Sequence, residues 1–540
     1  MRIAIAQINP TLGDFDYNSK KILEFIRRAQ EKQCELVVFP ESALFGYHPY
    51  DLLERPKIVQ KQEQYLNKIH KLIPKGIGVI LGAFTKNPRT KGRPYFNSAV
   101  FLVRGQKARH FHKQLLPTGD VFDEARFIQP GSMKNNYLSF KKKKFFVTIC
   151  EDIWAWPNAD GKSAYAKNPI TEVVKKKIDL VINISASPFF PEKLKQREYV
   201  TQKTARFFNA PILYANLVGA QDEVIYDGAS FVLSPTGKAL ARCEQFEEDL
   251  NVINLDTMQA WSQSRMFTGA EALRKAIVLG IRDFCLKTGL QKMHFGLSGG
   301  IDSAIVASLA VEALGPGKVT ALAMPGPFSS PDSLKLAEQL AKNLGIHFLN
   351  AEINATYQTV LETLEPLFNL KEFGVVQENI QARLRGLFLM AYANKENSLL
   401  LTTGNKSEYA TGYSTLYGDM CGGLAPIGDL TKRQVYELAR LYNAQGEVIP
   451  ELIITRPPTA ELRPNQRDQD SLPSYDILDA SVVNIIEKSG VAKSKADRWL
   501  LPLVLRTEFK RWQAPPILKV SEHSFGRGRR WPIAHKATEN

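Results

Sequence analysis

Cysteine is scarce in this chain of 540 residues: the five cysteines are scattered and odd in number. This pattern excludes a disulfide framework, and no Cys-x-x-Cys pair suggests a zinc site. No apolar run approaches the roughly 18 residues of a membrane span. The opening residues, MRIAIAQINP, lack the cleavage pattern of a secretory signal. We therefore expect a cytoplasmic protein with no membrane partner.

The composition excludes a disordered or low-complexity chain, because 44% of the residues are hydrophobic and 23% are charged. The length predicts about two to four domains. A net charge of +15 fits a nucleic-acid binder, a binder of phosphorylated small molecules, or a basic surface. The densest basic run, 141–144, lies just before an apolar strand. It predicts a charged hairpin turn, so no nucleic-acid partner is expected.

Short apolar runs separated by Gly, Pro or Asn predict strands throughout the first half of the chain. A helix is predicted over 17–33, because Ile22, Phe25, Ile26 and Ala29 share one helical face. Many strands follow one another without a helix between them, which predicts a sandwich of two sheets flanked by helices. The predicted strands lie at 2–8, 34–41, 78–84, 98–103, 144–152, 180–188 and 210–219.

The strand pattern stops near residues 255–268, and a helical stretch over 269–289 begins a second unit. Strands and helices then alternate, which predicts an α/β unit with a parallel, doubly wound sheet. The sequence therefore predicts a first domain at 1–255, a linker at 256–268 and a second domain at 269–540.

A glycine-rich loop, GLSGGIDS, joins an apolar strand to an apolar helix in the second unit. Glycines let the backbone approach a ligand closely, and N–H groups at a helix N-terminus bind anions. The loop lacks the ending of a Walker A motif and is not a dinucleotide fingerprint. It resembles the pyrophosphate loop of ATP pyrophosphatases, which split ATP into AMP and diphosphate. By that resemblance its residues hold ATP: Gly296, Leu297, Ser298, Gly299, Gly300, Ile301, Asp302 and Ser303.

Glu41, Lys113 and Cys150 each follow a predicted strand in the first half, where side chains can face a common cleft. A free thiol is only partly ionised near neutral pH and needs activation. Glu41 is expected to take its proton as general base. Lys113 is expected to lower the thiol pKa and to stabilise the oxyanion of a tetrahedral intermediate. Taken singly, each residue fits a core or surface position; together they predict nucleophilic catalysis.

With their flanking residues, these three resemble the nitrilase superfamily. In the second half, QENIQARLRG, TTGNKSEYATGYSTLYGD, APIGDLTK and RPPTAELRPNQRDQDSLPSYDILD resemble the NAD synthetase domain. The whole chain thus resembles the glutamine-dependent NAD synthetases. That resemblance implies a nitrilase-like αββα sandwich followed by a pyrophosphate-loop ATP pyrophosphatase domain. It also implies that deamido-NAD is adenylylated by ATP and then amidated by ammonia from glutamine.

The resemblance assigns residues around the expected glutamine site. Ser187 and Lys193 match glutamine-contacting positions, and Glu151 is expected to bind the α-amino group. Gly119 stands where the family commonly has a tyrosine, so the pocket is looser or a neighbour replaces that contact. Glu124 is a candidate for orienting Lys113. His112, next to Lys113, is interpreted as a packed histidine rather than a base.

The resemblance also assigns the synthetase site. Asp302 and Glu408 match Mg²⁺ ligands, since carboxylate oxygens that bridge to phosphate suit this ion. The matched ATP contacts outside the loop are Thr403, Lys432 and Thr459, and the deamido-NAD positions are Asn379, Glu408, Asp419 and Lys519.

The sequence does not decide the roles of three residues in this half. Arg383 and Arg385 are either partners of phosphate or carboxylate groups or ordinary helix-surface arginines. Leu416 stands where ammonia-dependent relatives often have a lysine, so another residue must meet that ligand charge.

Two rival functions remain at this point. Another pyrophosphate-loop amidotransferase, acting on asparagine, GMP or tRNA, shares the ATP loop. A non-catalytic nucleotide sensor would keep the binding loops without turnover. The family chemistry further implies an internal ammonia passage between the sites, and the resemblance implies a homo-oligomer.

Overall fold

The computed structural model describes residues 1–89, 91–158, 160–260 and 262–539. Contacts within the chain divide it into two compact units, Met1–Phe267 and Thr268–Asn540, called unit 1 and unit 2 below. The predicted linker at 256–268 contains strand β15 (Gln259–Ala260), and its residue 261 lies outside the described part. Within the described ranges, no helix is both long and apolar enough to cross a membrane.

Unit 1 contains a seven-stranded sheet in the order β15-β14-β1-β2-β3-β4-β5. Strands β1, β2 and β3 are parallel, and β3 pairs with β4 in antiparallel orientation. The remaining strands of this sheet are β1 (Arg2–Gln7), β2 (Leu36–Val38), β3 (Gly78–Lys86), β4 (Tyr95–Val103), β5 (Arg109–His112) and β14 (Asp249–Asn254).

A second sheet of unit 1 has six strands in the order β13-β12-β9-β8-β7-β6. Its central strands β7, β8 and β9 are parallel. The sheet consists of β6 (Tyr137–Phe140), β7 (Lys143–Ile149), β8 (Leu180–Ser185), β9 (Ile212–Asn216), β12 (Phe231–Leu233) and β13 (Ala239–Arg242). A separate antiparallel pair is formed by β10 (Val218–Gln221) and β11 (Val224–Asp227).

The basic run at 141–144 forms the hairpin that the sequence predicts. Strands β6 and β7 pair in antiparallel orientation on either side of the first two lysines, and Lys143 and Lys144 begin β7. Lys141 and Lys142 both have positive φ angles, of 46° and 64°, which suits a tight two-residue connection between twisted strands.

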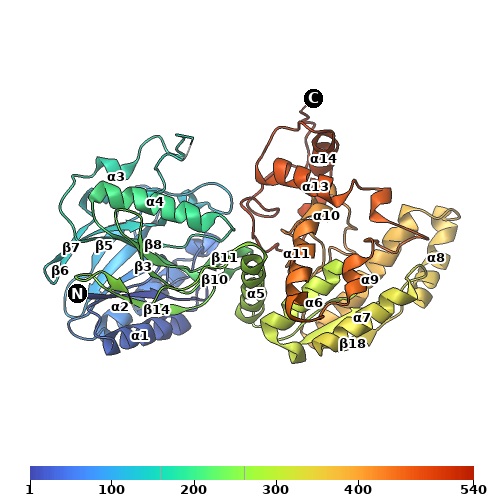
Figure 1. Cartoon of the computed structure of the whole chain (residues 1–540), viewed down its shortest axis with the longest axis horizontal. Helices are drawn as coiled ribbons and strands as arrows, with labels where there is room; N and C mark the ends of the chain where they lie inside the picture. The colour runs from blue at the N-terminus through green and yellow to red at the C-terminus, as the bar shows by residue number, and fades with distance from the viewer. Residues whose placement is uncertain (90, 159, 261, 540) are drawn as a thin grey trace. The chain divides into compact units, whose positions relative to one another are not determined.

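The two sheets of unit 1 pack face to face, and helices cover their outer faces. Residues of both sheets, such as Ile5 and Ile80 of one and Val147 and Ile182 of the other, share one apolar core. Figure 1 shows α1 (Phe15–Glu31) and α2 (Pro56–Leu72) on one side of these strands, and α3 (Pro169–Glu172) and α4 (Lys193–Phe208) on the other. The predicted αββα sandwich is therefore confirmed.

Helix α1 begins two residues before the predicted start. The Asp14 side chain accepts a hydrogen bond from the Tyr17 N–H and so caps the helix. The buried face contains Ile22, Phe25 and Ile26, as the periodicity predicts.

Unit 2 has a four-stranded parallel sheet in the order β18-β17-β16-β19, which confirms the doubly wound pattern. Its strands are β16 (Met293–Gly296), β17 (Val319–Ala323), β18 (His347–Asn350) and β19 (Leu399–Leu400). The helices are α5 (Gly269–Lys287), α6 (Ile301–Leu314), α7 (Pro331–Leu344), α8 (Asn354–Phe368), α9 (Val375–Glu396), α10 (Lys406–Thr411), α11 (Lys432–Tyr442), α12 (Glu451–Thr455), α13 (Tyr475–Val482), α14 (Lys495–Arg506) and α15 (Glu508–Arg511).

Candidate active sites

Lys113 lies at the centre of a buried ionic cluster in unit 1, one residue after β5. Its Nζ donates hydrogen bonds to Oε1 of Glu41 and to Oε1 of Glu124, each at 2.8 Å. All three side chains are fully buried. Burial lowers the pKa of Lys113, but the Glu124 and Glu41 carboxylates outweigh it, so that the pKa lies well above its usual range. This lysine is a permanent cation inside the unit.

Both carboxylate oxygens of Glu41 accept hydrogen bonds. Oε1 also accepts a hydrogen bond from Asn97 Nδ2 at 2.7 Å, and Oε2 accepts one from the Ala186 N–H at 2.8 Å. Burial raises the pKa of Glu41, and the positive charge of Lys113 opposes that shift. A carboxylate with a raised pKa accepts a proton more readily, which suits a general base.

Strand β3 passes directly behind Glu41. A Cβ atom at Gly82 would lie 2.2 Å from the Ser42 nitrogen and 2.5 Å from the Pro40 carbonyl oxygen. Only glycine allows this close backbone approach. The contact fixes the peptide that carries the Glu41 side chain.

Glu124 is held by two further side chains that the sequence did not indicate. Tyr47 Oη donates to Glu124 Oε1 at 2.6 Å, and Asn97 Nδ2 donates to the same oxygen at 3.3 Å. Asn97 therefore bridges Glu41 and Glu124. These partners lie far from one another along the chain, so no local motif could have found them.

Cys150 begins a short 3₁₀ turn, Cys150–Ile153, directly after β7, and its φ angle is +43°. Burial raises the pKa of the Cys150 thiol well above its usual range; the Glu41 charge adds to the shift and the Lys113 charge opposes it. The structure thus brings the three predicted residues into one electrostatic environment. In the free protein the thiol holds its proton, so a base must remove it during the reaction.

Asp152 connects the turn of Cys150 to the segment after Lys113. Its Oδ1 accepts hydrogen bonds from the N–H groups of Gln114 and Leu115 at 2.8 and 3.0 Å. Its Oδ2 accepts one from the Ile149 N–H at 3.0 Å. One buried carboxylate therefore holds the backbone next to the nucleophile and the backbone next to the lysine together.

Ser187 lies two residues after β8, and its backbone is held firmly. Its N–H donates to Asn216 Oδ1 at 2.8 Å. The buried Arg197 of α4 donates from Nε to Ser187 Oγ at 3.0 Å and from Nη1 to Asp227 Oδ1 at 2.7 Å. Arg197 was not indicated by the sequence, because a single arginine in a helix carries no local signal.

The other predicted glutamine contacts lie near the same turn. Glu151 Oε1 accepts a hydrogen bond from Tyr165 Oη at 2.8 Å, and burial raises the pKa of Glu151. Lys193 Nζ lies 3.9 Å from the centre of the Trp154 ring. Gly119 is exposed, and a Cβ there would meet no atom within 4 Å, so the position of the missing tyrosine is open.

His112 is packed rather than poised as a base. Its Nδ1 lies 2.8 Å from Ser98 Oγ and its ring stacks on Phe96 at 4.1 Å between centres. Burial lowers its pKa to about 4.

Unit 2 contains a cavity of about 300 Å³ at the carboxyl ends of its strands. Most of the predicted ligand-binding residues line it. They are Gly296, Leu297, Ser298, Gly300, Ile301, Asp302, Ser303, Thr403, Glu408, Asp419, Lys432 and Thr459. Arg385 also lines it, and burial lowers the pKa of this arginine to about 10.

Four other predicted residues do not line this cavity. Gly299 has φ +74°, and a Cβ there would lie 2.3 Å from the Ser333 carbonyl oxygen. Asn379 Oδ1 accepts a hydrogen bond from Thr415 Oγ1, and Arg383 Nε donates to the carbonyl of Leu416. Lys519 is buried, and its Nζ donates to the carbonyls of Ser521 and Glu522.

Asp302, Glu408 and Lys432 converge on one side of the cavity. Lys432 Nζ donates to Asp302 Oδ2 and lies 3.8 Å from Glu408 Oε1. Asn405 Nδ2 donates to Asp302 Oδ1 at 2.9 Å, while the Asn405 N–H donates to Glu408 Oε2 at 3.1 Å. Asn405 was not among the predicted residues, although its Asn-x-x-Glu spacing is a recognisable helix-capping signal.

The charge balance of this cluster leaves room for a further cation. Burial raises the pKa of Glu408 well above its usual range, and the nearby Asp302 carboxylate adds to the shift. Two carboxylates that share one lysine suit Mg²⁺, which prefers a few carboxylate oxygens together with phosphate oxygens and water. Among the described residues, no group of three or more metal-binding side chains exists, so further ligands would come from outside the protein.

Arg456 closes one wall of the cavity. Its Nη1 donates to Ser333 Oγ at 2.9 Å and its Nη2 donates to the Gly299 carbonyl. Glu461 accepts hydrogen bonds from the Ser330 N–H and from Ser333 Oγ. These contacts bind segment 456–461 to the start of α7, next to the glycine-rich loop.

Comparison with known proteins gives a consistent result over both units. Residues 2–263 match the carbon-nitrogen hydrolase family model, and residues 273–514 match the NAD synthase model. Glutamine-dependent NAD(+) synthetase of Synechocystis sp. is 42% identical, with 98% of each chain covered. That of Thermotoga maritima is 36% identical over 100% of this chain and 99% of its own. The solved structure of the Acinetobacter baumannii enzyme with ADP matches 100% of this chain and 99% of its own at a TM-score of 0.77 and 33% identity.

Proposed function

The chain belongs to the family of glutamine-dependent NAD(+) synthetases, and on this basis we propose how its two units divide the reaction. The enzyme is a ligase that forms a carbon–nitrogen bond with glutamine as nitrogen donor and ATP as co-substrate. Unit 1 releases ammonia from glutamine. Unit 2 joins that ammonia to the nicotinate carboxyl group of deamido-NAD. The relatives agree on this activity, which favours it over asparagine-, GMP- or tRNA-directed amidation and over a sensor without turnover.

In unit 1, Cys150 is the proposed nucleophile. Its sulfur attacks the amide carbon of glutamine while Glu41 takes the thiol proton. Lys113 stabilises the oxyanion of the tetrahedral intermediate. The intermediate collapses when Glu41 returns the proton to nitrogen and ammonia leaves, and a glutamyl thioester remains. Glu41 then takes a proton from water, whose oxygen attacks the thioester carbon. The carbon–sulfur bond breaks, Glu41 returns the proton to the Cys150 sulfur, and glutamate leaves.

Glu124 is proposed to position Lys113 rather than to react. It accepts a hydrogen bond from Lys113 Nζ and is itself held by Tyr47 and Asn97. This arrangement fixes the ammonium group and keeps it charged. The proposed glutamine contacts are Gly119, Glu151, Ser187 and Lys193, with the carboxylate of Glu151 facing the substrate α-amino group.

In unit 2, a nicotinate carboxylate oxygen of deamido-NAD attacks the α-phosphorus of ATP, and diphosphate leaves. Ammonia then attacks the carbonyl carbon of the adenylate, and AMP leaves to give the amide. The glycine-rich loop 296–303 presents backbone N–H groups at the start of α6, where phosphates bind well. Lys432, Thr403 and Thr459 complete the proposed ATP site, and the proposed deamido-NAD contacts are Asn379, Glu408, Asp419 and Lys519.

Asp302 and Glu408 are the proposed holders of Mg²⁺. When bound, the ion would neutralise phosphate charge next to the leaving diphosphate. Lys432 lies between the two carboxylates and keeps them close in the free enzyme. Asn405 holds both carboxylates from the other side.

A homo-oligomer is proposed, assembled through the α8–α9 region of unit 2. Large apolar side chains are exposed there within a few residues of one another: Leu367 is 69% exposed, Phe368 64% and Val375 68%. Exposed apolar groups gathered in one region are typical of an interface. A second copy of the chain is the proposed occupant.

The observation that carries the proposal is the buried contact of Lys113 with Glu41 and Glu124 beside Cys150, together with the cavity of unit 2 that the glycine-rich loop lines. The test is to incubate the purified protein with deamido-NAD, ATP, Mg²⁺ and glutamine. NAD, AMP, diphosphate and glutamate should form in equal amounts. Formation of ADP and phosphate, or no product with ammonium chloride in place of glutamine, would contradict it.

A further inference from the structure

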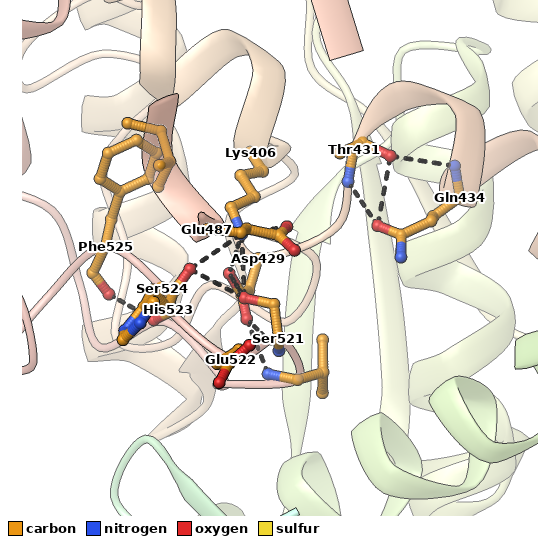
Figure 2. Close-up of polar contacts among 12 residues, drawn as sticks. Lys406, Asp429, Thr431, Gln434, Glu487, Ser521, Glu522, His523, Ser524 and Phe525 are labelled. Carbon is orange, nitrogen blue, oxygen red and sulfur yellow. Dashed lines mark hydrogen bonds and ion pairs between the residues drawn. The ribbon is translucent and has the colours of Figure 1, made fainter. Parts of the chain in front are cut away.

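Lys406 is a fully buried lysine of unit 2 that does not line the cavity at the carboxyl ends of the strands. Figure 2 shows its Nζ surrounded by oxygen atoms. It lies 2.7 Å from Glu487 Oε1 and 3.0 Å from Asp429 Oδ1. It also donates to Ser521 Oγ at 2.9 Å and to the His523 carbonyl at 3.1 Å. No step of the proposed reaction uses this group.

Asp429 connects the same cluster to the C-terminal segment. Its Oδ2 accepts hydrogen bonds from the N–H groups of Val520 and Ser521, each at 2.7 Å. Its Oδ1 accepts one from Ser521 Oγ at 2.9 Å. Residues 520–523 are therefore bound to a buried ion pair rather than lying loosely on the surface.

Both members of the ion pair are close in sequence to residues of the active site: Lys406 to Glu408, and Asp429 to Lys432. Lys406 is the first residue of α10, between Asn405 and Glu408. Its backbone N–H donates to the Leu430 carbonyl at 2.8 Å, next to Asp429. Asp429 precedes Thr431, which caps α11 through Gln434 as Figure 2 shows, and Lys432 follows as the first residue of that helix.

The starts of α10 and α11 are thus held together by Lys406 and Asp429. Glu408 lies on the first of these helical turns and Lys432 on the second, and Lys432 Nζ lies close to both Asp302 and Glu408. A buried charge that loses its partner carries a large cost, so the surrounding backbone must rearrange when either partner is removed. A rearrangement of these two turns would separate Glu408 from Lys432.

We propose that Lys406 and Asp429 are positioning residues for adenylylation, and that segment 520–523 completes their site. They act through the starts of α10 and α11 and touch no substrate. The inference rests on the proposed function of unit 2. Partners of this kind behind a metal- and phosphate-binding group typically change affinity or activity by about 10–100-fold.

The test uses Lys406→Met in the full chain, measured without and with turnover. Binding of ATP, followed by calorimetry in the absence of deamido-NAD, should weaken about tenfold. Ammonia-driven NAD formation should fall by a similar or larger factor in kcat. Glutamine hydrolysis by unit 1 should stay within about twofold of wild type. Lys406→Arg should recover part of the lost ATP affinity, because it restores the positive charge.

Asn443→Ala is the matched control at the other end of α11. Asn443 holds Val448 and Ile449 through three hydrogen bonds, so its loss also destabilises unit 2. At a temperature well below both unfolding midpoints, this control should bind ATP like wild type. Wild-type ATP affinity and turnover in Lys406→Met, or equal losses in both variants, would overturn the inference.

If Lys406→Met does not fold, Ser521→Ala replaces it in the ATP-binding measurement. It removes one hydrogen bond from Lys406 and one from Asp429 and leaves the ion pair itself intact. A smaller loss of ATP affinity in the same direction is expected, and none would contradict the inference. Failure of wild type to make NAD would instead contradict the proposed function, so the two failures are distinguishable.

Discussion

The guanidinium of Arg197 holds Ser187 at two points. Nε donates to Ser187 Oγ at 3.0 Å, and Nη2 donates to the Ser187 carbonyl at 2.7 Å. Asp227 Oδ1 in turn accepts from Arg197 Nη1 and fixes the planar group. A planar cation with several donors makes this arrangement possible, and lysine cannot reproduce it.

Arg197→Lys should therefore weaken glutamine binding more than it slows the chemistry. We expect KM for glutamine to rise about tenfold with a smaller fall in kcat, because Ser187 loses two of its supports. Ammonia-driven NAD formation should be unchanged. Steady-state kinetics with glutamine and with ammonium chloride check this. Arg242→Lys is the control. Arg242 forms a partly exposed ion pair with Glu198, which lies on α4 like Arg197, and this change should leave KM for glutamine near wild type.

Cys150→Ala should abolish glutamine-driven NAD formation and spare formation from ammonium chloride. The sulfur is the only group proposed to attack glutamine, whereas unit 2 needs only free ammonia. Product formation with each nitrogen donor separates the two activities. Cys243→Ala, another buried free thiol of unit 1, is the control. Equal loss of both activities in Cys150→Ala alone would refute the division of labour.

Glu124→Gln should lower kcat for glutamine hydrolysis by roughly 100-fold with little change in KM. Lys113 loses one of its two carboxylate partners and its ammonium group is held less firmly. The measurement is glutamate release under saturating glutamine. Glu192→Gln, in an exposed pair with Lys195, should have no effect. A rise in KM with an unchanged kcat would instead assign Glu124 to binding.

Stability of unit 1 should fall in acid because of His48. Burial lowers the pKa of His48 to about 4; Glu124 and Asp123 oppose this shift, and Lys113 adds to it. Between about pH 6.5 and 4 the unfolded chain binds a proton that the folded unit does not. The contribution of His48 to the free energy of unfolding is therefore complete above about pH 6.5 and is lost as the pH falls; the total loss is roughly 3 kcal/mol.

His48→Asn should flatten this dependence, since the amide oxygen can still accept the Tyr50 N–H that now bonds to Nδ1. His112, with a similarly lowered pKa of about 4, would keep part of the slope. Hydrogen exchange of unit 1 peptides from pH 7 to 4.5 measures the effect. His347→Asn, at an exposed position of unit 2, should leave the unit 1 profile unchanged.

Val375→Asp should shift the protein toward the monomer if α8 and α9 form the contact between copies. A charge at this 68% exposed position costs little in the monomer but much in an apolar interface. Sedimentation velocity over a range of concentrations gives the molecular mass. Val491→Asp, at a 67% exposed valine outside this region, is the control. An unchanged mass in Val375→Asp, or a monomeric wild type, would contradict the proposal.

Sequence reasoning located residues that follow strands, because the ends of strands are visible as ends of apolar runs. Glu41 ends the predicted run 34–41 and Cys150 lies near the end of the run 144–152, and the structure places both with Lys113 in one buried environment. The glycine-rich loop was visible for the same reason. Its neighbours in the cavity, such as Glu408 and Lys432, came from motif resemblance.

The supporting partners were not predictable, because their contacts join distant segments. Asn97 and Tyr47 reach Glu124 across different strands, and Arg197 reaches Ser187 from a helix. Such contacts leave no periodicity in the chain. Lys519 is assigned by motif resemblance alone: its ammonium group bonds to the carbonyls of Ser521 and Glu522, and its contact with deamido-NAD stays a prediction.

The tight crossing of β3 behind the general base has an evolutionary consequence. With the Ser42 nitrogen 2.2 Å from where a Cβ would stand, every mutation at Gly82 must push aside the peptide of Glu41. Codon 82 is thus closed to neutral drift even though its residue takes no part in the chemistry. Saturation mutagenesis at position 82 is therefore expected to yield no improved glutaminase.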